Sequence, residues 1–356
     1  AVDGRLVEVR GSDLHLRSGI PPLARADGEL KRISEQPLEA AHLSRLLRSI
    51  MTPAVSEAYA SELDVDWAYE LEGFGRFRCN AGVDRHGPFG VFRVIPAKIL
   101  TAEELGLSRE VQQFASLTKG LVLVTGPTGS GKSTTLAGII DLVNRTRQDH
   151  ILTIEDPIEF VHESKQCLVT QRQVGVHTRG FKHALRAALR EDPDAILAGE
   201  LRDLETMALA IETAETGHLL FGCLHTTTAA STLDRIIDQF PADRQSQVRV
   251  MLSESLRGVV TQVLCRKIGG GRVAAREVLI TIPAISNLIR EGKTFQIPSI
   301  MQTNRRVGML TLNDSLLDLV DQGLVEPKEA WLKAADKTGL LTSLKAKGHN
   351  ISFAEA

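Results

Sequence analysis

The segment GPTGSGKST, residues 126–134, constrains the fold of this chain more than any other feature. It satisfies the pattern G-x-x-x-x-G-K-[ST], and it lies between the apolar run 120–125 and the amphipathic run 134–146. A glycine-rich turn between a buried strand and a helix directs main-chain N–H groups toward phosphates, and the helix amino terminus adds positive potential. The segment therefore predicts a nucleotide-binding loop in an α/β domain.

The residues of this loop have separate expected roles. We expect Lys132 to contact the β and γ phosphates of ATP, and we expect the hydroxyl of Ser133 to ligate Mg²⁺. A glycine-rich turn that matches the pattern by chance is the alternative, and the flanking strand and helix argue against it. The other loop residues expected to bind the nucleotide are Thr128, Gly129, Ser130, Gly131 and Thr134.

From residue 120 onward the chain alternates apolar runs with longer helical runs, which is typical of a mainly parallel sheet. Short apolar runs of this kind predict buried strands. The expected strands are 120–125, 150–155, 195–200 and 218–225, and the expected helices are 134–146, 181–191 and 228–240. Three later segments also show a helical pattern: 284–292, 312–323 and 327–339.

Residues 12–95 show a different pattern, with many turns and short β-like runs, the last of which ends at Pro96. One helical stretch at 40–51 interrupts them, so a small α+β domain is expected. Thr101 and Glu104 match a capping box, which predicts that a helix begins there. The expected division is a small domain at 1–97, a linker at 98–106 and the larger α/β domain at 107–356.

Carboxylates follow two of the expected strands. Glu200 ends the third strand, at the sheet edge where the P-loop lies, and it is our candidate for polarising the attacking water. Glu155, Asp156 and Glu159 follow the second strand in the same way. Either cluster alone is more typical of a solvated loop or a helix cap, but the pairing with a P-loop favours a magnesium and water site.

Two histidines, His218 and His225, stand at the two ends of the fourth expected strand. Seven strand residues span roughly 23 Å, so the two cannot ligate one metal ion while the strand stays extended. His225 lies at the carboxyl end, which faces the phosphates, and we expect it to contact the γ-phosphate. His218 lies at the strand entrance, where a structural role and a role in nucleotide binding are equally open.

The charge balance bears on the class of partner. The chain has 42 Lys and Arg against 44 Asp and Glu, a net charge of -2, and 4% aromatic residues. A nucleic-acid translocase normally carries a basic stripe or stacking aromatic side chains, so no nucleic-acid partner is expected. No apolar run approaches the ~20 residues of a membrane span, and the charged amino terminus does not match a secretory signal, so a cytoplasmic location is expected.

The cysteines predict neither a zinc cluster nor a disulfide framework. They lie far apart in the sequence, and no two of them form a C-x-x-C pair. We expect them to act as small buried hydrophobic side chains. They are Cys79, Cys167, Cys223 and Cys265.

In order and spacing, four segments resemble the P-loop, aspartate box, acidic strand and histidine box of the secretion-superfamily ATPases. They are GPTGSGKST, ILTIEDPIEF, DPDAILAGELRD and TAETGHLLFGCLHTTTAASTLDRIIDQFP. Within that superfamily the chain resembles the type IV pilus retraction ATPases, through SDLHLRSGIPPLARADGELKRI, VRVMLSESLRGVVTQVL and GRVAAREVLITIPAISNLIREGK. The resemblance covers nearly the whole chain, which lacks the four-cysteine zinc insertion usual in the pilus-extension and type II secretion ATPases.

The resemblance implies an architecture and a function. It implies a PAS-like α+β domain followed by a RecA-like P-loop ATPase domain with a C-terminal helical segment. It further implies a homohexameric ring at the cytoplasmic base of a pilus machine, peripheral to the inner membrane and in contact with the platform protein there. ATP hydrolysis with Mg²⁺ would then power pilus retraction and twitching motility.

The resemblance also implies roles for individual residues. Lys132 matches the P-loop lysine of the family, and Glu200 matches its catalytic glutamate. Arg78 and Arg93 match arginines of the N-terminal domain that engage phosphate. The residues that match the aspartate box and the histidine box are Glu155, Asp156, Glu159, His218 and His225.

Two positions depart from the family pattern. The family commonly reads LHTN where this chain has LHTT, which places Thr227 at the asparagine. Its motif AIRNLIRE is AISNLIRE here, with Ser286 in place of an arginine. Hydrolysis should not depend on Ser286, but coupling to retraction could. An accessory or regulatory paralogue that modulates a partner motor is therefore the main alternative, and a RecA-like nucleic-acid translocase is a more distant one.

Overall fold

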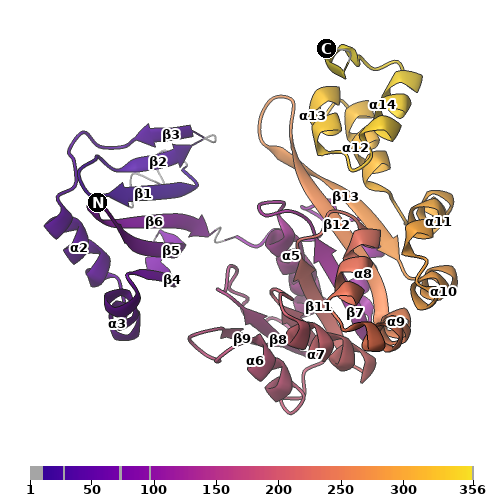
Figure 1. The fold of residues 1–356 in the computed structure, drawn as a ribbon, viewed down its shortest axis with the longest axis horizontal. Coiled ribbons are helices and arrows are strands. Elements are labelled where there is room, and N and C mark those ends of the chain that lie inside the picture. Colours follow the sequence, from indigo (N-terminus) through magenta and orange to yellow (C-terminus); the bar gives the residue numbers. More distant parts are fainter. Residues whose placement is uncertain (1–10, 27–28, 72–73, 96–97, 355–356) are drawn as a thin grey trace. The chain divides into compact units, whose positions relative to one another are not determined.

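The computed structural model describes residues 11–26, 29–71, 74–95 and 98–354. The chain forms two compact units, which Figure 1 draws as ribbons. The first unit comprises the chain up to Lys98 together with Pro157–Val161. The second comprises Ile99–Asp156 and His162–Ala356. Grouping of the short segment 157–161 with the first unit was not anticipated from the sequence.

In its described residues the first unit is a six-stranded antiparallel sheet with two helices, in the strand order β3-β2-β1-β6-β5-β4. Leu43 and Leu47, one helical turn apart in α2, are fully buried in one cluster with Trp67 and Phe92 of the sheet. The expected α+β character is therefore confirmed. The elements are β1 (Asp13–Arg17), β2 (Leu23–Ala26), β3 (Glu29–Arg32), α2 (Ala40–Ser49), α3 (Pro53–Glu62), β4 (Asp64–Leu71), β5 (Gly75–Asp84) and β6 (Gly87–Ile95).

The second unit contains a seven-stranded sheet in the order β13-β12-β7-β11-β10-β8-β9. Neighbouring strands run parallel except for the hairpin of β12 and β13, so the expected mainly parallel sheet is confirmed. The strands are β7 (Gly120–Thr125), β8 (His150–Glu155), β9 (Leu168–Gln173), β10 (Ala195–Ala198), β11 (Leu219–Leu224), β12 (Leu256–Arg266) and β13 (Arg272–Ile280).

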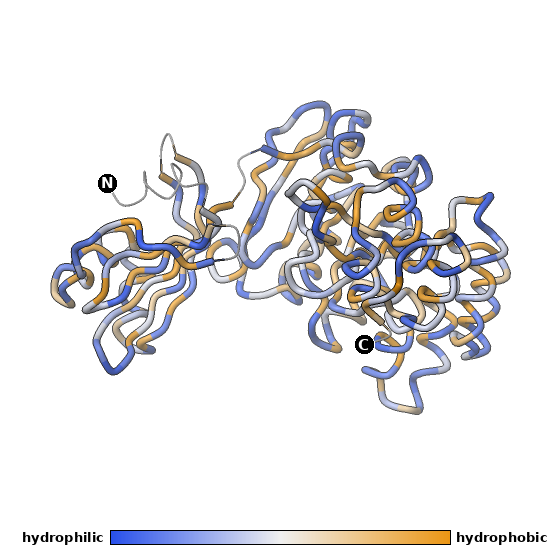
Figure 2. Tube along the Cα trace, turned by 90° about the horizontal axis from the view of Figure 1, so that it is seen from above, coloured by the Kyte–Doolittle hydropathy of each residue, from blue (hydrophilic) through white to orange (hydrophobic). Residues whose placement is uncertain are grey.

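Helices cover both faces of this sheet, and the alternation along β7 shows how. Leu121 and Leu123 face a cluster that includes side chains of α6 to α11, whereas Val122 and Val124 face a cluster built with α4 and α5. Figure 2 shows the hydrophobic stretches of this unit running through its interior and hydrophilic loops at its rim. The helices on these faces are α4 (Arg109–Gln113), α5 (Lys132–Thr146), α6 (Phe181–Ala188), α7 (Leu204–Glu215), α8 (Ala229–Asp238), α9 (Ala242–Ser255), α10 (Pro283–Glu291) and α11 (Ile297–Thr303).

The last helices form a separate small cluster around the far end of the β12–β13 hairpin. They are α12 (Leu312–Asp321), α13 (Pro327–Lys333) and α14 (Lys337–Ala346). The prediction of a single helix at 327–339 is wrong, because the chain is extended at Ala334 and a new helix follows its N-cap residue Asp336. The Asp336 carboxylate accepts from Gly339 N at 2.9 Å, which caps a new helix. The expected helix at 312–323 is confirmed with its end at Asp321.

The segment after residue 98 is not an isolated connection. Residues 99–106 group with the second unit, and Ala102 is fully buried there in the cluster that contains α5. The capping-box bonds are present, from Glu104 N to Thr101 Oγ1 at 3.2 Å and from Thr101 N to Glu104 Oε2 at 2.9 Å. The prediction that a helix begins there is wrong. The segment forms only a single turn, which ends at Gly106 with a positive φ of 60°.

The third buried strand is shorter than expected, since β10 ends at Ala198 and not at residue 200. Gly199 N still donates to Ile154 O of β8, but Leu201 N donates to Cys223 O of β11. The chain therefore leaves its pairing with β8 at this point, and Glu200 lies in the connection between β10 and α7, residues 199–203, which we call the acidic turn. The sequence pattern also did not identify β9, α7, α9 or the β12–β13 hairpin.

Two observations concern cysteines and membranes. All four cysteines are buried, as expected. Among the residues described, none of the helices combines the length and the hydrophobicity that crossing a bilayer requires.

Candidate active site

The P-loop connects β7 to α5 and is shaped by a glycine that no other residue could replace. Gly126 has a φ of 143°, and a Cβ atom there would lie 2.2 Å from the main-chain oxygen of Gln262. Within the described chain no side chain caps α5, which begins after Gly131. The hydroxyl of Ser130 is also buried without a hydrogen-bond partner among these residues. The first-turn N–H groups of α5 and this hydroxyl suit a phosphate group.

Strand β12 holds the loop from its other side. The Gln262 side chain is 1% exposed; it donates from Nε2 to Ser130 O at 2.7 Å and accepts from Thr135 Oγ1 at 2.8 Å. One residue earlier, the hydroxyls of Thr261 and Thr125 are hydrogen-bonded at 2.8 Å. The loop and the first turn of α5 are thus attached to a strand 127 residues later in the chain. Sequence reasoning missed Gln262, although a glutamine inside the apolar run VVTQVL is a signal for a buried polar contact.

Replacing Gln262 with leucine is expected to lower both stability and nucleotide affinity. Leucine has similar bulk but leaves the Ser130 carbonyl and the Thr135 hydroxyl without their partner, which costs about 1–3 kcal/mol. Thermal unfolding and equilibrium ATP binding measure the two effects. Gln112→Leu is the matched control, since Gln112 Nε2 donates to a backbone carbonyl, Leu107 O, at 2.8 Å outside the P-loop. Equal changes in affinity for both variants would contradict the assigned contact.

Three expected site residues form one row of polar contacts beside the P-loop. Lys132 is 6% exposed, and its Nζ donates to Gly126 O at 2.9 Å and to Pro127 O at 3.0 Å. The same Nζ lies 3.5 Å from His225 Nδ1, and His225 Nε2 lies 2.7 Å from Glu200 Oε1. A neutral imidazole protonated on Nε2 donates to Glu200 and leaves Nδ1 as an acceptor toward Lys132. His225 thus connects the P-loop lysine to the acidic turn.

A further cation, Arg202, completes the surroundings of Glu200. Arg202 Nε donates to Glu200 Oε1 at 2.6 Å. Burial alone would raise the pKa of Glu200, but the hydrogen bonds and charges of Arg202 and His225 hold that pKa below its usual value. The carboxylate is therefore ionised at neutral pH, as a group that polarises water must be. The motif containing Arg202 was identified from the sequence, but a role for this residue was not.

The acidic end of β8 lies beside this turn, because β8 and β10 are adjacent parallel strands. Glu155 Oε1 accepts from Thr153 Oγ1 at 2.6 Å and from Gln171 Nε2 at 3.0 Å. The hydrogen bond to Glu200, and the nearby charges of Glu200 and Asp156, raise the pKa of Arg202. Glu155, Asp156 and Glu200 therefore share one edge of the sheet with Lys132, as the parallel topology requires.

Four expected site residues lie elsewhere. His218 precedes β11 at the opposite edge of the sheet, where His218 O accepts from Gly120 N at 3.0 Å. Glu159 lies in the segment 157–161, which groups with the first unit. Arg78 of β5 and Arg93 of β6 are cross-strand neighbours in the sheet of the first unit. Contacts of these four residues with a nucleotide stay predictions.

Arg93 has a partner within its own unit. Its Nε donates to Asp13 Oδ1 at 2.8 Å, and the Arg93 side chain is 63% exposed, whereas that of Asp13 is 8% exposed. Burial raises the pKa of Asp13, but hydrogen bonds from Ser12 and Arg93 and the charge of Arg93 bring it below its usual value. The ion pair therefore orients an otherwise exposed guanidinium on the surface of the sheet.

Comparison with known proteins places this chain in a family. Residues 91–271 match the model of the type II/IV secretion system protein family. The chain is 54% identical to the type IV pilus retraction ATPase PilT of Pseudomonas aeruginosa, covering 91% of this chain and 94% of that protein. It is 50% identical to a twitching motility protein of Neisseria gonorrhoeae, covering 90% of this chain and 86% of that protein.

A solved structure agrees in fold as well as in sequence. The crystal structure of the pilus retraction motor PilT with bound ADP has a TM-score of 0.88 and 45% identity, covering 94% of this chain and 96% of that chain. The fold of this chain thus occurs, over nearly the whole length of both chains, in a relative whose structure was solved with bound ADP. The chain therefore belongs to the type IV pilus retraction ATPases of the type II/IV secretion family, and it is an ATPase that couples hydrolysis to mechanical work.

Proposed function

We propose that this chain is a retraction motor of a type IV pilus, working as a homohexameric ring on the cytoplasmic side of the inner membrane, against the platform protein of the pilus machine. The observation that carries the proposal is the row Lys132–His225–Glu200 beside the P-loop, which unites a phosphate-binding cation with an ionised carboxylate. The similarity to PilT over 91% of the chain supports the assignment to retraction.

Within the site each residue has a proposed part in hydrolysis. The P-loop and Lys132 bind the ATP phosphates, Glu200 orients and polarises the attacking water, and His225 contacts the γ-phosphate. Ser133, exposed in the first turn of α5, would hold Mg²⁺, which would neutralise the developing phosphate charge. Most ligands of such an ion are phosphate oxygens and water, so one hydroxyl with the nearby acids Glu155 and Asp156 fits it.

The arginines of the first unit supply the second part of the proposal. Arg78 and Arg93 are cross-strand neighbours, so both can approach one phosphate group when the first unit closes on a nucleotide. The planar guanidinium suits bridging phosphate oxygens. In this movement Arg93 would leave Asp13 and bind the more highly charged phosphate instead. Glu159 is proposed to line the same closed site, whereas His218, at the opposite edge of the sheet, is proposed to have the structural role.

Arg93→Ala is expected to keep nucleotide binding and ring assembly and to lower the rate of ATP turnover by about tenfold or more, since an arginine at the γ-phosphate acts mainly in the transition state. Steady-state ATPase assays and size-exclusion chromatography measure these properties. Arg17→Ala is the control, because Arg17 is also partly exposed in this sheet and pairs with Asp84 at 2.6 Å. Parental turnover in Arg93→Ala would remove Arg93 from the site.

Rings assembled from two variants show whether Arg93 acts in the site of its own chain or in that of a neighbouring chain. Chains carrying Arg93→Ala and chains carrying Glu200→Gln are each expected to be nearly inactive alone. If each arginine completes the site of its own chain, mixing the two variants yields no active site. Recovery of ATPase activity on mixing would instead show that the arginine acts across a subunit boundary.

Retraction in a pilus-retraction deletion strain tests the whole function. Complementation by the parent chain, but not by Glu200→Gln, is the expected result. ATPase activity without rescue would favour the accessory paralogue, a reading motivated by Ser286, which is half-buried in α10 where the family commonly has an arginine. Thr227, the second departure, is exposed in the turn before α8.

A further inference from the structure

Glu277 of β13 is a buried carboxylate that the hydrolysis scheme above does not use. The residue is 8% exposed. Its Oε1 accepts from Ala229 N at 2.6 Å, and its Oε2 accepts from Leu312 N at 3.3 Å. Ala229 and Leu312 are the first residues of α8 and α12. One carboxylate therefore binds the amino termini of two helices that are far apart in the sequence.

The register of the sheet places Glu277 level with the active site. Glu277 is the cross-strand partner of Thr261, Thr261 is the partner of Thr125, and Thr125 is the partner of Leu224. These four residues form one row across β13, β12, β7 and β11. Thr125 directly precedes the P-loop, and Leu224 directly precedes His225. A displacement of β13 at this row would therefore act next to both the P-loop and His225.

The turn between His225 and Ala229 is held at each end. Leu224, at the end of β11, fixes its beginning, and Glu277 fixes its end through Ala229 N. Inside the turn, Thr228 caps α8 by accepting from Ser231 N at 3.1 Å. Since the turn is only a few residues long, a change in the position of the α8 amino terminus moves His225 relative to its contacts.

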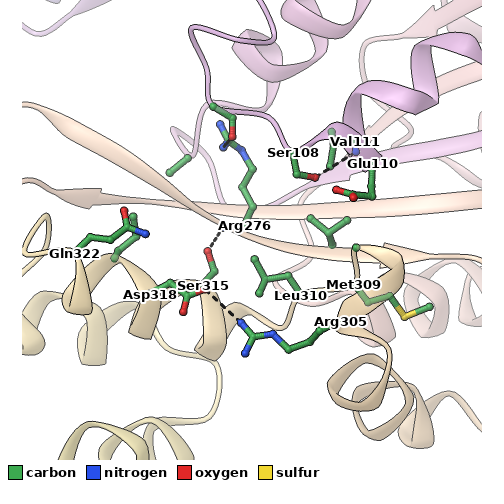
Figure 3. Close-up of a pocket in the computed structure, with 15 residues that line it drawn as sticks. Ser108, Glu110, Val111, Arg276, Arg305, Met309, Leu310, Ser315, Asp318 and Gln322 are labelled. Carbon is green, nitrogen blue, oxygen red and sulfur yellow. Dashed lines mark hydrogen bonds and ion pairs between the residues drawn. The ribbon is translucent and has the colours of Figure 1, made fainter. Parts of the chain in front are cut away.

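The second helix connects the same carboxylate to the C-terminal cluster. Leu312 is 2% exposed within that cluster. The neighbouring residue of β13, Arg276, donates its main-chain N–H to Ser315 Oγ of α12 at 3.0 Å, as Figure 3 shows. A cavity of about 400 Å³, lined in part by α4, β13 and α12, lies beside this contact. Leu312 and Leu316 of α12 are buried against the β12–β13 hairpin in that cluster, so the hydrogen bonds to β13 add to an apolar attachment.

The two N–H donors favour a carboxylate at this position over its amide. Burial raises the pKa of Glu277 above its usual value, and the hydrogen bonds from Ala229 and Leu312 offset only part of that rise. The positive ends of two helices also stabilise a negative charge between them. Glutamine has a single acceptor oxygen, and its NH₂ group would face an N–H donor.

We propose that Glu277 is a positioning residue for ATP hydrolysis: it holds His225 against Glu200 and Lys132 through the amino terminus of α8, and its second bond makes that position depend on α12. The proposal rests on the hydrolytic role given to His225 above. It adds a connection between the C-terminal helices and the nucleotide site that runs through a single carboxylate.

Glu277→Gln is expected to lower kcat about tenfold while KM for ATP changes by no more than about twofold, because His225 acts on the moving phosphate. In a His225→Ala background the same substitution should lower kcat by no more than about a further twofold, since both changes remove the same contribution of His225. Asp336→Asn is the control: Asp336 caps α14 in the same C-terminal cluster and should leave kcat unchanged. Equal fold-losses in both backgrounds would overturn the proposal.

A second measurement does not depend on turnover. The rate of diethyl pyrocarbonate modification of His225, followed by mass spectrometry, should rise severalfold in Glu277→Gln, because the imidazole loses its fixed contact with Glu200. His183, exposed in α6, is the internal reference. An unchanged modification rate at His225 would overturn the proposal, whether or not the chain has ATPase activity. A parent chain without ATPase activity would count only against the proposed function. If Glu277→Gln does not fold, Glu277→Asp, which shortens the reach by one methylene, serves for both comparisons.

Discussion

Glu200→Gln is expected to bind ATP as the parent does and to hydrolyse it ~10³-fold more slowly. The amide keeps the shape of the side chain and can still accept from Arg202 or His225, but it loses the negative charge that orients and polarises water. Because these two neighbours hold the pKa of Glu200 low, the parent group is ionised at neutral pH, so the substitution removes a full charge. Nucleotide binding and single-turnover hydrolysis separate the two effects.

Glu215→Gln is the matched control for this experiment. Glu215 is exposed at the end of α7 in the same unit, and the substitution removes one carboxylate without touching the acidic turn. It is expected to have parental turnover. Parental turnover in Glu200→Gln itself would mean that another carboxylate polarises the water, and Glu159 would then be the first candidate.

Lys132→Ala is expected to weaken ATP binding on the order of 10³-fold, which corresponds to about 4 kcal/mol. Lys132 is 6% exposed and is the P-loop cation, so its loss leaves the triphosphate without its main fixed counter-charge. Titration with a fluorescent ATP analogue measures the affinity. The substitution also removes the neighbour of His225 Nδ1, so turnover at saturating ATP should fall as well.

Lys119→Ala controls for the loss of a lysine in general. Lys119 is exposed immediately before β7, at the edge of the sheet opposite the P-loop, and its replacement should leave ATP affinity unchanged. A similar loss of affinity in both variants would show that net charge, and not contact with phosphate, governs binding. Near-parental affinity in Lys132→Ala would contradict the assignment of the loop.

The local pattern of the sequence was sufficient to predict the P-loop, the buried strands and the placement of Glu200 and His225 near Lys132. The reason is that a strand, a glycine-rich turn and a helix are consecutive in the chain, and parallel strands bring their carboxyl ends to one edge of a sheet. The alternation of apolar and helical runs predicted that these strands are parallel. No contact between specific side chains was needed for these predictions.

Only the tertiary structure decided the partners that hold these groups in place. Gln262 reaches the P-loop from β12, Glu277 reaches α8 and α12 from β13, and Arg93 pairs with Asp13. Each contact joins segments at least 35 residues apart, and a single polar residue in an apolar run does not reveal its partner. Strand β10 likewise ends at Ala198: Gly199 N still donates to β8, but Leu201 N donates to β11, which is a fact of pairing and not of local sequence.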